Sequence, residues 1–330
     1  MTAELSAERR RAMLRTAMGP TIAAALADPL VLEIMVNPDG ALRLDRLGEG
    51  RVATGIRFDP AQVERIIRLV ASHSRFEVHA AAPIVSAELP PYGDGAGERF
   101  EGVLPPVSPG PCFSIRKPAT RLYSLVDYVS DGIMSFEAAQ LLSRAVGERR
   151  NILVAGGTSS GKTTLANALL AEMAGLDERV ILIEDTRELQ SPAADTVALR
   201  TRAGHVTMAD LVRSTLRLRP DRIIVGEVRG PEALDMLKAW NTGHPGGIAT
   251  VHANSAASAL LRVEQLVQEA VVTVPRRLIV DAIDIVVFIA GRGSARRVDT
   301  IARVAGLDPD GGGYAVVPLS SDHTSAFQGD

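Results

Sequence analysis

The sequence predicts a two-domain α/β protein, in which a smaller α+β domain precedes a larger domain built on a parallel sheet. The chain has 330 residues, which exceeds the size at which a single hydrophobic core usually stops growing. From residue 136 onward, short apolar runs alternate with helical patterns, as in right-handed βαβ units. One of these runs leads directly into a glycine-rich segment at residues 156–163.

The first third of the chain predicts the α+β domain, over residues 1–116. Its elements in order are a helix at 3–27, two strands at 30–36 and 41–47 around the turn Asn37-Pro38-Asp39-Gly40, a helix from Pro60, and short strands at 99–104 and 112–116. Residues 117–134 are expected to form a linker. The larger domain is then expected over residues 135–330.

The second domain is predicted from its alternation of helices and apolar strands. The helices are expected at about 138–145, 162–173, 208 onward, 231–240 and 255–270, and the strands at 151–155, 180–183, 223–225, 248–251 and 283–289. Thr207 and Asp210 have the spacing of a capping box at the start of one helix. Residues 297–304 and 314–319 are expected to close the domain as a hairpin.

Composition excludes several classes of protein. Hydrophobic residues make up 46% and charged residues 23%, which excludes a disordered chain, a collagen and a coiled-coil rod. The net charge is −3, whereas a protein whose main function is to bind nucleic acid is usually basic. The single cysteine, Cys112, excludes an internal disulfide and a cysteine-based zinc site. It fits a reducing compartment.

The sequence predicts neither a secretory leader nor a membrane span. The first fifteen residues are charged and lack the apolar core of a signal peptide. The most apolar stretch, residues 271–290, carries Arg276, Arg277, Asp281 and Asp284, which a spanning helix would not tolerate. We therefore expect a protein that is cytosolic or peripheral to a membrane.

Residues 156–163 match the phosphate-binding pattern G-x-x-x-x-G-K-[ST] at every defined position. Glycines let backbone N–H groups turn toward phosphates, the Lys162 ammonium reaches the β- and γ-phosphates, and the Thr163 hydroxyl ligates Mg²⁺. The following helix directs its positive end at the anion. We therefore expect ATP and Mg²⁺ to bind at Gly156, Gly157, Thr158, Ser159, Ser160, Gly161, Lys162, Thr163 and Thr164.

Hydrolysis also needs carboxylates at the edge where the parallel strands end. Glu184 and Glu227 each follow one of the predicted strands. We expect Glu227 to hold Mg²⁺ through its water and Glu184 to polarise the attacking water. The alternative for each acid is that it caps a following helix or pairs with Arg187 or Arg229.

Two histidines bracket the predicted strand at 248–251. We expect His252 to sense the γ-phosphate and His244 to position the neighbouring glycine-rich loop, the alternative for both being a purely structural role. No neighbouring set of His, Cys and carboxylate residues has the spacing of metal ligands, so a histidine-based metal site is not expected.

An arginine from a neighbouring subunit often assists phosphoryl transfer. A cluster that could supply one consists of Arg200, Arg202, Arg213, Arg217 and Arg219. We expect Arg217 first and Arg202 second to act in trans, and the others to be solvated or ion-paired. Arg116 and Lys117, at the end of the first domain, could reach the nucleotide from outside the sheet.

Taken together, these motifs resemble those of the secretion ATPases of type II secretion, type IV secretion and type IV pili. Four boxes occur in the family's order: the Walker A loop at 156–163, an Asp box at 183–189, an atypical Walker B segment at 219–229 and a His box at 242–254. The sequences of residues 239–247 (AWNTGHPGG) and 188–190 (ELQ) look most like those of the TrbB-type conjugative-transfer branch. Ser191 stands where that branch leads us to expect a cysteine.

The resemblance implies a RecA-like C-terminal domain, a PAS-like N-terminal domain and a homo-hexameric ring. It assigns phosphate and Mg²⁺ binding to Lys162 and Thr163, the catalytic acid to Glu184, Walker B to Glu227 and the His box to His252. ATP turnover would power conjugative transfer or type IV secretion at the cytoplasmic face of the inner membrane, with membrane-associated secretion proteins as partners. The lone cysteine argues against family members with a four-cysteine zinc module.

Other interpretations remain open. One is a type IV pilus assembly or retraction motor, or a type II secretion motor. Another is a hexameric nucleic-acid translocase, which predicts a basic channel and salt-sensitive stimulation by DNA, although no direct specific nucleic-acid binding is expected at this net charge. A third is a scaffold that binds ATP and barely hydrolyses it.

The predicted N-terminal helix carries Arg9, Arg10, Arg11 and Arg15. It could dock on acidic phospholipid or pack on its own domain, and we favour packing.

Overall fold

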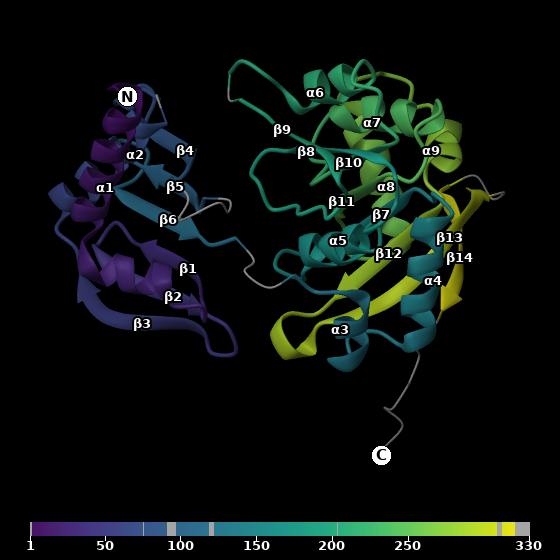
Figure 1. Cartoon of the computed structure of the whole chain (residues 1–330), viewed down its shortest axis with the longest axis horizontal. Helices are drawn as coiled ribbons and strands as arrows, with labels where there is room; N and C mark the ends of the chain where they lie inside the picture. The colour runs from purple at the N-terminus through teal and green to yellow at the C-terminus, as the bar shows by residue number, and fades with distance from the viewer. Residues whose placement is uncertain are drawn as a thin grey trace. The chain divides into compact units, whose positions relative to one another are not determined.

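The computed structural model describes residues 2–74, 76–90, 97–118, 122–202, 204–308 and 312–320, with side chains omitted for 2–11 and 320. Backbone contacts divide the chain into two compact units, Met1–Thr120 and Arg121–Asp330, which Figure 1 labels element by element. They are called the N-terminal unit and the C-terminal unit below.

The N-terminal unit contains one antiparallel sheet and two long helices. Its elements are α1 (Thr2–Ala27), β1 (Val31–Val36), β2 (Ala41–Arg46), β3 (Gly50–Arg57), α2 (Pro60–His73), β4 (Ile84–Glu88), β5 (Arg99–Val103) and β6 (Cys112–Arg116). The strand order is β3-β2-β1-β6-β5-β4, and each neighbouring pair is antiparallel.

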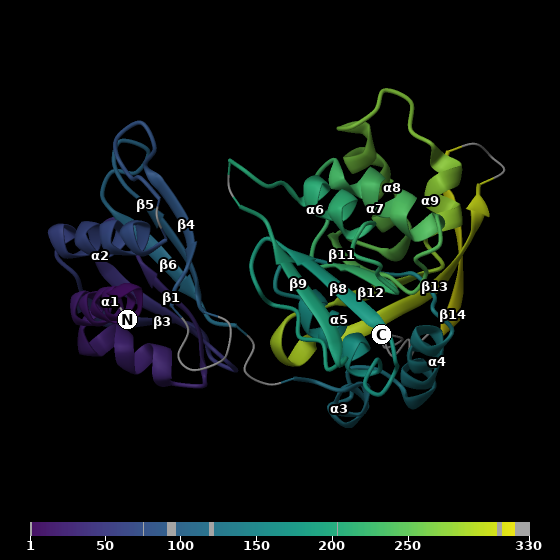
Figure 2. The same cartoon turned by 45° about the horizontal axis from the view of Figure 1, so that its top comes forward.

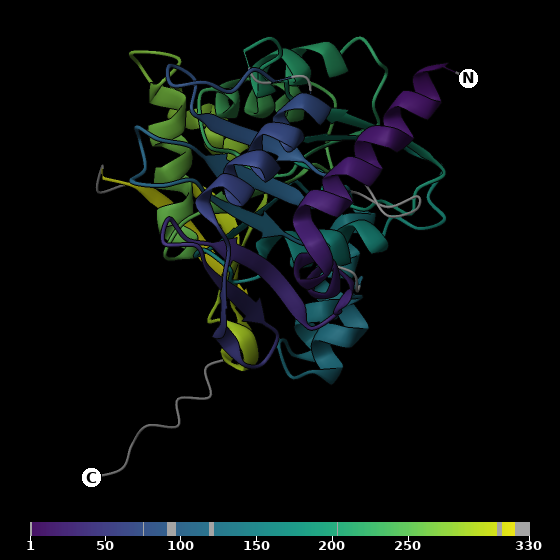
Figure 3. The same ribbon diagram turned by 90° about the vertical axis from the view of Figure 1, so that its left-hand side faces the viewer.

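Both helices cover the same face of this sheet (Figure 3). Helix α2 begins where Pro60 fixes the first helical residue and the Asp59 carboxylate accepts from a backbone N–H. Buried side chains from α1, among them Leu14, Met18 and Ile22, join the same core. The described part of α1 thus packs on its own domain, while the side chains of Arg9, Arg10 and Arg11 lie outside those described.

The C-terminal unit is built on an eight-stranded sheet. Its elements are α3 (Leu125–Ser130), α4 (Phe136–Gly147), β7 (Ile152–Gly156), α5 (Lys162–Ala171), β8 (Arg179–Glu184), β9 (Asp195–Arg200), α6 (Met208–Thr215), β10 (Arg222–Val225), α7 (Glu232–Asn241), β11 (Ile248–His252), α8 (Ala256–Gln268), α9 (Arg276–Ala282), β12 (Ile285–Ala290), the 3₁₀ turn η1 (Gly293–Ala295), β13 (Arg297–Leu307) and β14 (Tyr314–Ser320). The order is β14-β13-β12-β7-β11-β10-β8-β9. The parallel part of the sheet consists of β12, β7, β11, β10, β8 and β9. The strands β13 and β14 add an antiparallel edge next to β12.

Helices cover both faces of the parallel strands (Figure 2). Ile152 and Val154 of β7 pack with α3, α4 and α5, whereas Leu153 and Ala155 pack with α6, α7, α8 and α9. Because successive side chains of a strand point to opposite faces, a strand buried on both sides must be apolar throughout. The continuous apolar runs therefore mark the central strands and place the ligand edge at their carboxyl ends.

The structure confirms the α/β class, and the elements predicted from sequence recur within a few residues. Besides the 3₁₀ turn η1, five helices and strands were not predicted: β3, β4, β9, α3 and α9. β3, β4 and β9 lack a continuous apolar run because they include exposed positions at sheet edges, and the two helices are short. α3 lies inside the segment expected to be a linker, yet Leu125, Tyr128 and Met134 are buried in the C-terminal core. That part of the segment therefore belongs to the C-terminal unit.

Among the described residues, no helix combines the length and apolar character needed to cross a membrane.

Candidate functional site

Four strand ends meet along one edge of the C-terminal sheet. β7 and β11 are paired so that Gly156 lies opposite His252, and β10 and β8 are paired so that Val225 lies opposite Ile183. Because the strands are parallel, the loops that follow them gather at this edge. These loops carry the glycine-rich segment and the acids and histidine predicted to act with it.

The glycine-rich loop turns sharply into α5. Ser159 and Gly161 have positive φ values of 61° and 97°, a region that disfavours most side chains. Gly161 is the N-cap of α5 and supplies no side-chain hydrogen bond. The first N–H groups of α5 are thus left without a side-chain cap, at the positive end of the helix dipole. This is the geometry that binds phosphate.

Lys162 folds back over this loop. Its ammonium donates to the carbonyl oxygens of Gly156, at 3.2 Å, and Gly157, at 3.1 Å, and the residue is only 7% exposed. It also lies 3.1 Å from Nδ1 of His252. The cation predicted to reach phosphate is therefore at the carboxyl edge, close to the predicted sensor.

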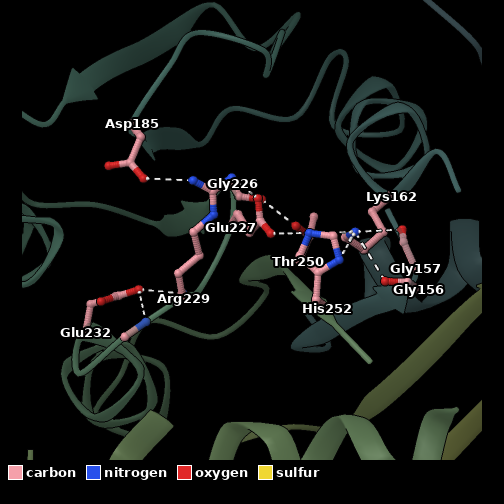
Figure 4. A network of polar contacts seen from close by, with 11 residues as sticks. Gly156, Gly157, Lys162, Asp185, Gly226, Glu227, Arg229, Glu232, Thr250 and His252 are labelled. Carbon is pink, nitrogen blue, oxygen red and sulfur yellow. Dashed lines mark hydrogen bonds and ion pairs between the residues drawn. The ribbon is translucent and has the colours of Figure 1, made fainter. Parts of the chain in front are cut away.

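His252 connects Lys162 to the acid that follows β10 (Figure 4). Nε2 of His252 lies 2.8 Å from Oε1 of Glu227, and the other carboxylate oxygen of Glu227 accepts from the Arg229 guanidinium. Arg229 also lies 3.6 Å from Asp185, which follows β8. The chain of contacts thus runs from the glycine-rich loop through three neighbouring strand ends.

The charges in this chain shift two pKa values in opposite directions. Burial lowers the pKa of His252, and the Lys162 ammonium lowers it further, although Glu227 acts against both. His252 is therefore a neutral imidazole at pH 7, able to donate from one nitrogen and accept at the other. The hydrogen bond to Glu227 raises the pKa of Arg229, so this guanidinium stays charged.

Glu184 lies at the end of β8 and is only 4% exposed. Its Oε1 accepts from the backbone N–H groups of Glu188, at 2.9 Å, and Leu189, at 2.8 Å. Burial raises the pKa of Glu184 to about 7, although the two hydrogen bonds oppose the shift. A carboxylate with this pKa can take up a proton near neutral pH, as a general base must. These bonds tie Glu184 to the loop after β8 rather than to a helix.

The glycine between β10 and Glu227 makes room for Glu184. A Cβ added at Gly226 would lie 3.0 Å from Cγ of Glu184 and 3.4 Å from its Oε1. The displacement of the acid by one place from the end of β10 therefore has a packing reason. Only glycine leaves the Glu184 side chain in its present position.

The donors at this edge fit Mg²⁺. The ion prefers oxygen ligands and usually keeps several waters beside one or two protein oxygens and the phosphates of its substrate. Thr163 offers a hydroxyl at the start of α5, and Glu227 offers a buried carboxylate oxygen, Oε1, that faces His252. No set of three His, Cys, Asp or Glu side chains with metal-binding geometry occurs in the described part of the chain.

The structure does not place every predicted residue in this network. Arg217, after α6, and Arg202, after β9, are exposed and make no described contact with Glu227 or Lys162. Arg116 ends β6 in the N-terminal unit and is exposed. His244 precedes β11, so it lies at the opposite end of the strand from His252, where its Nδ1 is 3.3 Å from the carbonyl oxygen of Ala239.

Two residues of the network were underestimated from sequence. Arg229 was considered only as a competing partner for the acids, and Asp185 was given no role of its own. Arg229 contacts both Glu227 and Asp185, so its pairing with Glu227 coexists with the contact between Glu227 and His252. The signal was the spacing of two residues between Glu227 and Arg229, which cannot reveal a contact with another strand.

Several known proteins are similar to this chain in sequence or in fold. The family model described as type II/IV secretion system protein matches residues 21–292. The conjugal transfer protein TrbB of Rhizobium radiobacter is 48% identical over 89% of this chain and 90% of its own length. The type IV secretion system protein PtlH of Bordetella pertussis is 36% identical over 81% of this chain and 88% of its own.

A similar solved structure is the pilus retraction motor PilT with bound ADP, which has a TM-score of 0.60 and 18% identity over 92% of this chain and 82% of that chain. At this identity the likeness concerns the fold, which in the C-terminal unit is RecA-like. The family model and the sequence relatives show that the chain belongs to the type II/IV secretion system protein family, as an ATPase close to the TrbB conjugal-transfer proteins.

Proposed function

We propose that this protein is a Mg²⁺-dependent ATPase that works as a homo-hexameric ring and powers conjugative transfer or type IV secretion at the cytoplasmic face of the inner membrane. The observation that carries the proposal is the contact of His252 with both Lys162 and Glu227, beside the glycine-rich loop. It joins a phosphate-binding cation to a carboxylate at the edge where ligands bind in parallel sheets.

Each side chain has a defined task in this proposal. The N–H groups of the loop and the Lys162 ammonium hold the phosphates, while Thr163 and Glu227 hold Mg²⁺, which would neutralise charge on the transferring phosphoryl group. Glu184 accepts a proton from the attacking water, a role supported by its pKa of about 7. His252 lies where it could respond to the terminal phosphate, because it contacts Lys162 directly.

The assignment to conjugative transfer rests on the relatives. The relatives named for conjugal transfer and type IV secretion match this chain over most of their own length. We infer that membrane-associated secretion proteins are the partners, and that acidic phospholipid could contribute to attachment. A pilus or type II secretion motor and a nucleic-acid translocase remain the alternatives.

The test is the specific Mg²⁺-ATPase rate as a function of protein concentration, for the wild type and for Lys162→Ala. We expect a wild-type rate that rises with concentration, because a ring completes each site with a neighbouring chain, and no activity in the variant. A negligible wild-type rate with ADP still bound, even with lipid vesicles added, would favour the scaffold interpretation.

A second arm separates the motor from a translocase. We expect stimulation by vesicles that contain acidic phospholipid and none by single- or double-stranded DNA at 50–200 mM salt, the range over which DNA binding falls steeply. Stimulation by DNA that declines with salt would contradict the proposed function.

A further inference from the structure

A tight turn lies on the other side of the glycine-rich loop from His252. β7 has two neighbours, β11 on one side and β12 on the other, and Ile289 of β12 pairs with the same Gly156 that pairs with His252. The chain after β12 therefore also leaves the sheet at the ligand edge. It forms the short turn η1 before β13, and Figures 1 and 2 agree in placing this turn beside α3.

Arg296, the residue that follows this turn, lies against the glycine-rich loop. A Cβ built on Gly161 would be 2.8 Å from Nε of Arg296, 2.9 Å from its Cζ and 3.2 Å from its Cδ. The guanidinium therefore occupies the space that a side chain at Gly161 would need. Besides its positive φ of 97°, this contact is a second reason for glycine at position 161.

Polar atoms without partners gather around this contact. Nε of Arg296, the hydroxyl of Tyr128 in α3 and the hydroxyl of Ser160 in the loop are all buried and have no hydrogen-bond partner among the described residues. Burial raises the pKa of Tyr128, and the positive charge of Arg296 counteracts that rise. The two side chains are therefore close enough to interact electrostatically. Buried polar groups normally have partners, and three without them beside one loop point to a ligand.

The two sides of the loop differ in their chemistry. On the β11 side, Lys162, His252 and Glu227 supply the cation and the carboxylate that the terminal phosphate and its metal require. On the β12 side, Arg296 and the aromatic Tyr128 supply a flat cation in an apolar surrounding. A nucleotide whose terminal phosphate faces His252 must extend its ribose and base away from it, toward the β12 side.

We propose that Arg296 binds the nucleoside half of ATP, with the plane of its guanidinium against the face of the base. This proposal rests on the function proposed above and adds a residue that determines nucleotide affinity. A guanidinium suits the role because it is planar, weakly hydrated and stacks on aromatic rings, whereas an ammonium does not. Arg296 is thus a contact for the base, distinct from the phosphate contacts of Lys162.

The test compares ADP with inorganic pyrophosphate, which carries two phosphates and no nucleoside. Calorimetric titration of Arg296→Ala should show ADP affinity reduced about tenfold, equivalent to about 1.4 kcal/mol, with pyrophosphate affinity unchanged. Arg296→Lys should show the same selective loss of ADP affinity, because lysine keeps the positive charge but lacks the planar guanidinium that stacks on the base. Arg297→Ala is the matched control, since that exposed neighbour pairs with Asp299 at 3.2 Å, and both affinities should stay at wild-type values.

The outcomes separate this proposal from the one on which it rests. Equal losses of ADP and pyrophosphate affinity in Arg296→Lys would mean that Arg296 supports the phosphate loop, and would overturn the proposal. Unchanged ADP affinity in either Arg296 variant would overturn it as well. Arg296→Lys decides the matter if the alanine variant does not fold. Lys162→Ala should lose both ligands, and a wild-type protein that binds neither ADP nor pyrophosphate would instead contradict the proposed function.

Discussion

The Lys162 ammonium and Nδ1 of His252 lie 3.1 Å apart, in front of the glycine-rich loop. The contact requires an imidazole without charge, because a second cation at this distance would repel the first. The structure meets that requirement, since burial and Lys162 both lower the pKa of His252. Its other nitrogen faces Glu227 at 2.8 Å, so one neutral ring connects the phosphate-binding cation to the proposed metal-binding carboxylate.

His252→Asn should therefore impair turnover much more than nucleotide binding. We expect kcat to fall about 100-fold, the typical cost of removing one preorganised polar group from a phosphoryl-transfer or acyl-transfer site. ADP affinity should change by less than about threefold, because Lys162 and the loop N–H groups remain. Steady-state kinetics and calorimetry measure the two quantities. A variant with wild-type kcat would show that His252 is structural.

Gly226→Ala should displace Glu184. The new methyl group would lie 3.0 Å from Cγ of Glu184, which is too close for two carbons in a well-packed site. We expect a loss of about 1–3 kcal/mol in the free energy of unfolding, as for other overpacked sites, and a lower kcat with ADP affinity retained. Denaturant unfolding and ATPase assays provide the measurements.

Two further variants isolate the contact between Gly226 and Glu184. Gly147→Ala is the control, because a Cβ there meets nothing within 4 Å, and its stability should match the wild type. In the background of Glu184→Ala, which removes Cγ and leaves only Cβ at 3.6 Å, Gly226→Ala should cost less stability than in the wild type. Equal costs in both backgrounds would show that the strain has another source.

Glu184→Gln should stabilise the protein in a pH-dependent way while it strongly slows hydrolysis. The folded pKa of Glu184 is about 7, against an ordinary value of 4.5. Below pH 4.5 both folded and unfolded states hold the proton, so burial of this group carries no charge penalty. As the pH rises from 4.5 through 7, the unfolded state releases its proton first, and wild-type stability falls.

Glutamine does not titrate, so the variant avoids this loss. We expect it to exceed the wild type by about 2–3 kcal/mol at pH 8 and by much less at pH 4, with kcat reduced about 100-fold or more. Unfolding curves across this pH range and ATPase assays at pH 8 test the pair of effects. A stability gain independent of pH would show that burial does not raise the pKa of Glu184. Full ATPase activity of the variant would show that Glu184 is not the general base.

Much of the fold could be predicted because its central strands are buried on both faces. Residues 152–156 and 180–183 must be apolar throughout, and continuous runs of this kind are visible in sequence. Sheet edges give no such signal. β9, for example, alternates between exposed and half-buried positions, and its pairing with β8 depends on residues far away in the chain.

The residues of the site likewise fall into two groups, those that sequence patterns locate and those that depend on how the strands are ordered in the sheet. Lys162, Glu184, Glu227 and His252 were predicted because each stands at the end of a strand or at the start of a helix, which are positions that sequence patterns locate. The position of Arg296 against Gly161 could not be predicted, because it depends on the order in which β12 and β7 join the sheet. The packing of Gly226 against Glu184 could not be predicted either, since Glu184 comes from another strand.

The last prediction concerns the arginines expected to act in trans. Arg217 and Arg202 are exposed, and neither contacts the described network around Glu227. A residue that acts on the nucleotide of a neighbouring chain is not expected to contact the site of its own chain. Arg217→Ala and Lys162→Ala should each be inactive alone, the first for want of the arginine and the second for want of the phosphate-binding cation. Mixed together, they allow an intact loop from one variant to meet an intact arginine from the other.

In randomly mixed rings that combination occurs at about one interface in four, so we expect the mixture to recover about a quarter of the wild-type ATPase rate. The same mixing with Arg202→Ala ranks the two candidates. No recovery, although sedimentation shows mixed rings, would place the arginine in the same chain as its nucleotide. Full activity of Arg217→Ala alone would exclude it from the site altogether, because a residue that stabilises transition-state charge contributes a factor of about 10³ or more.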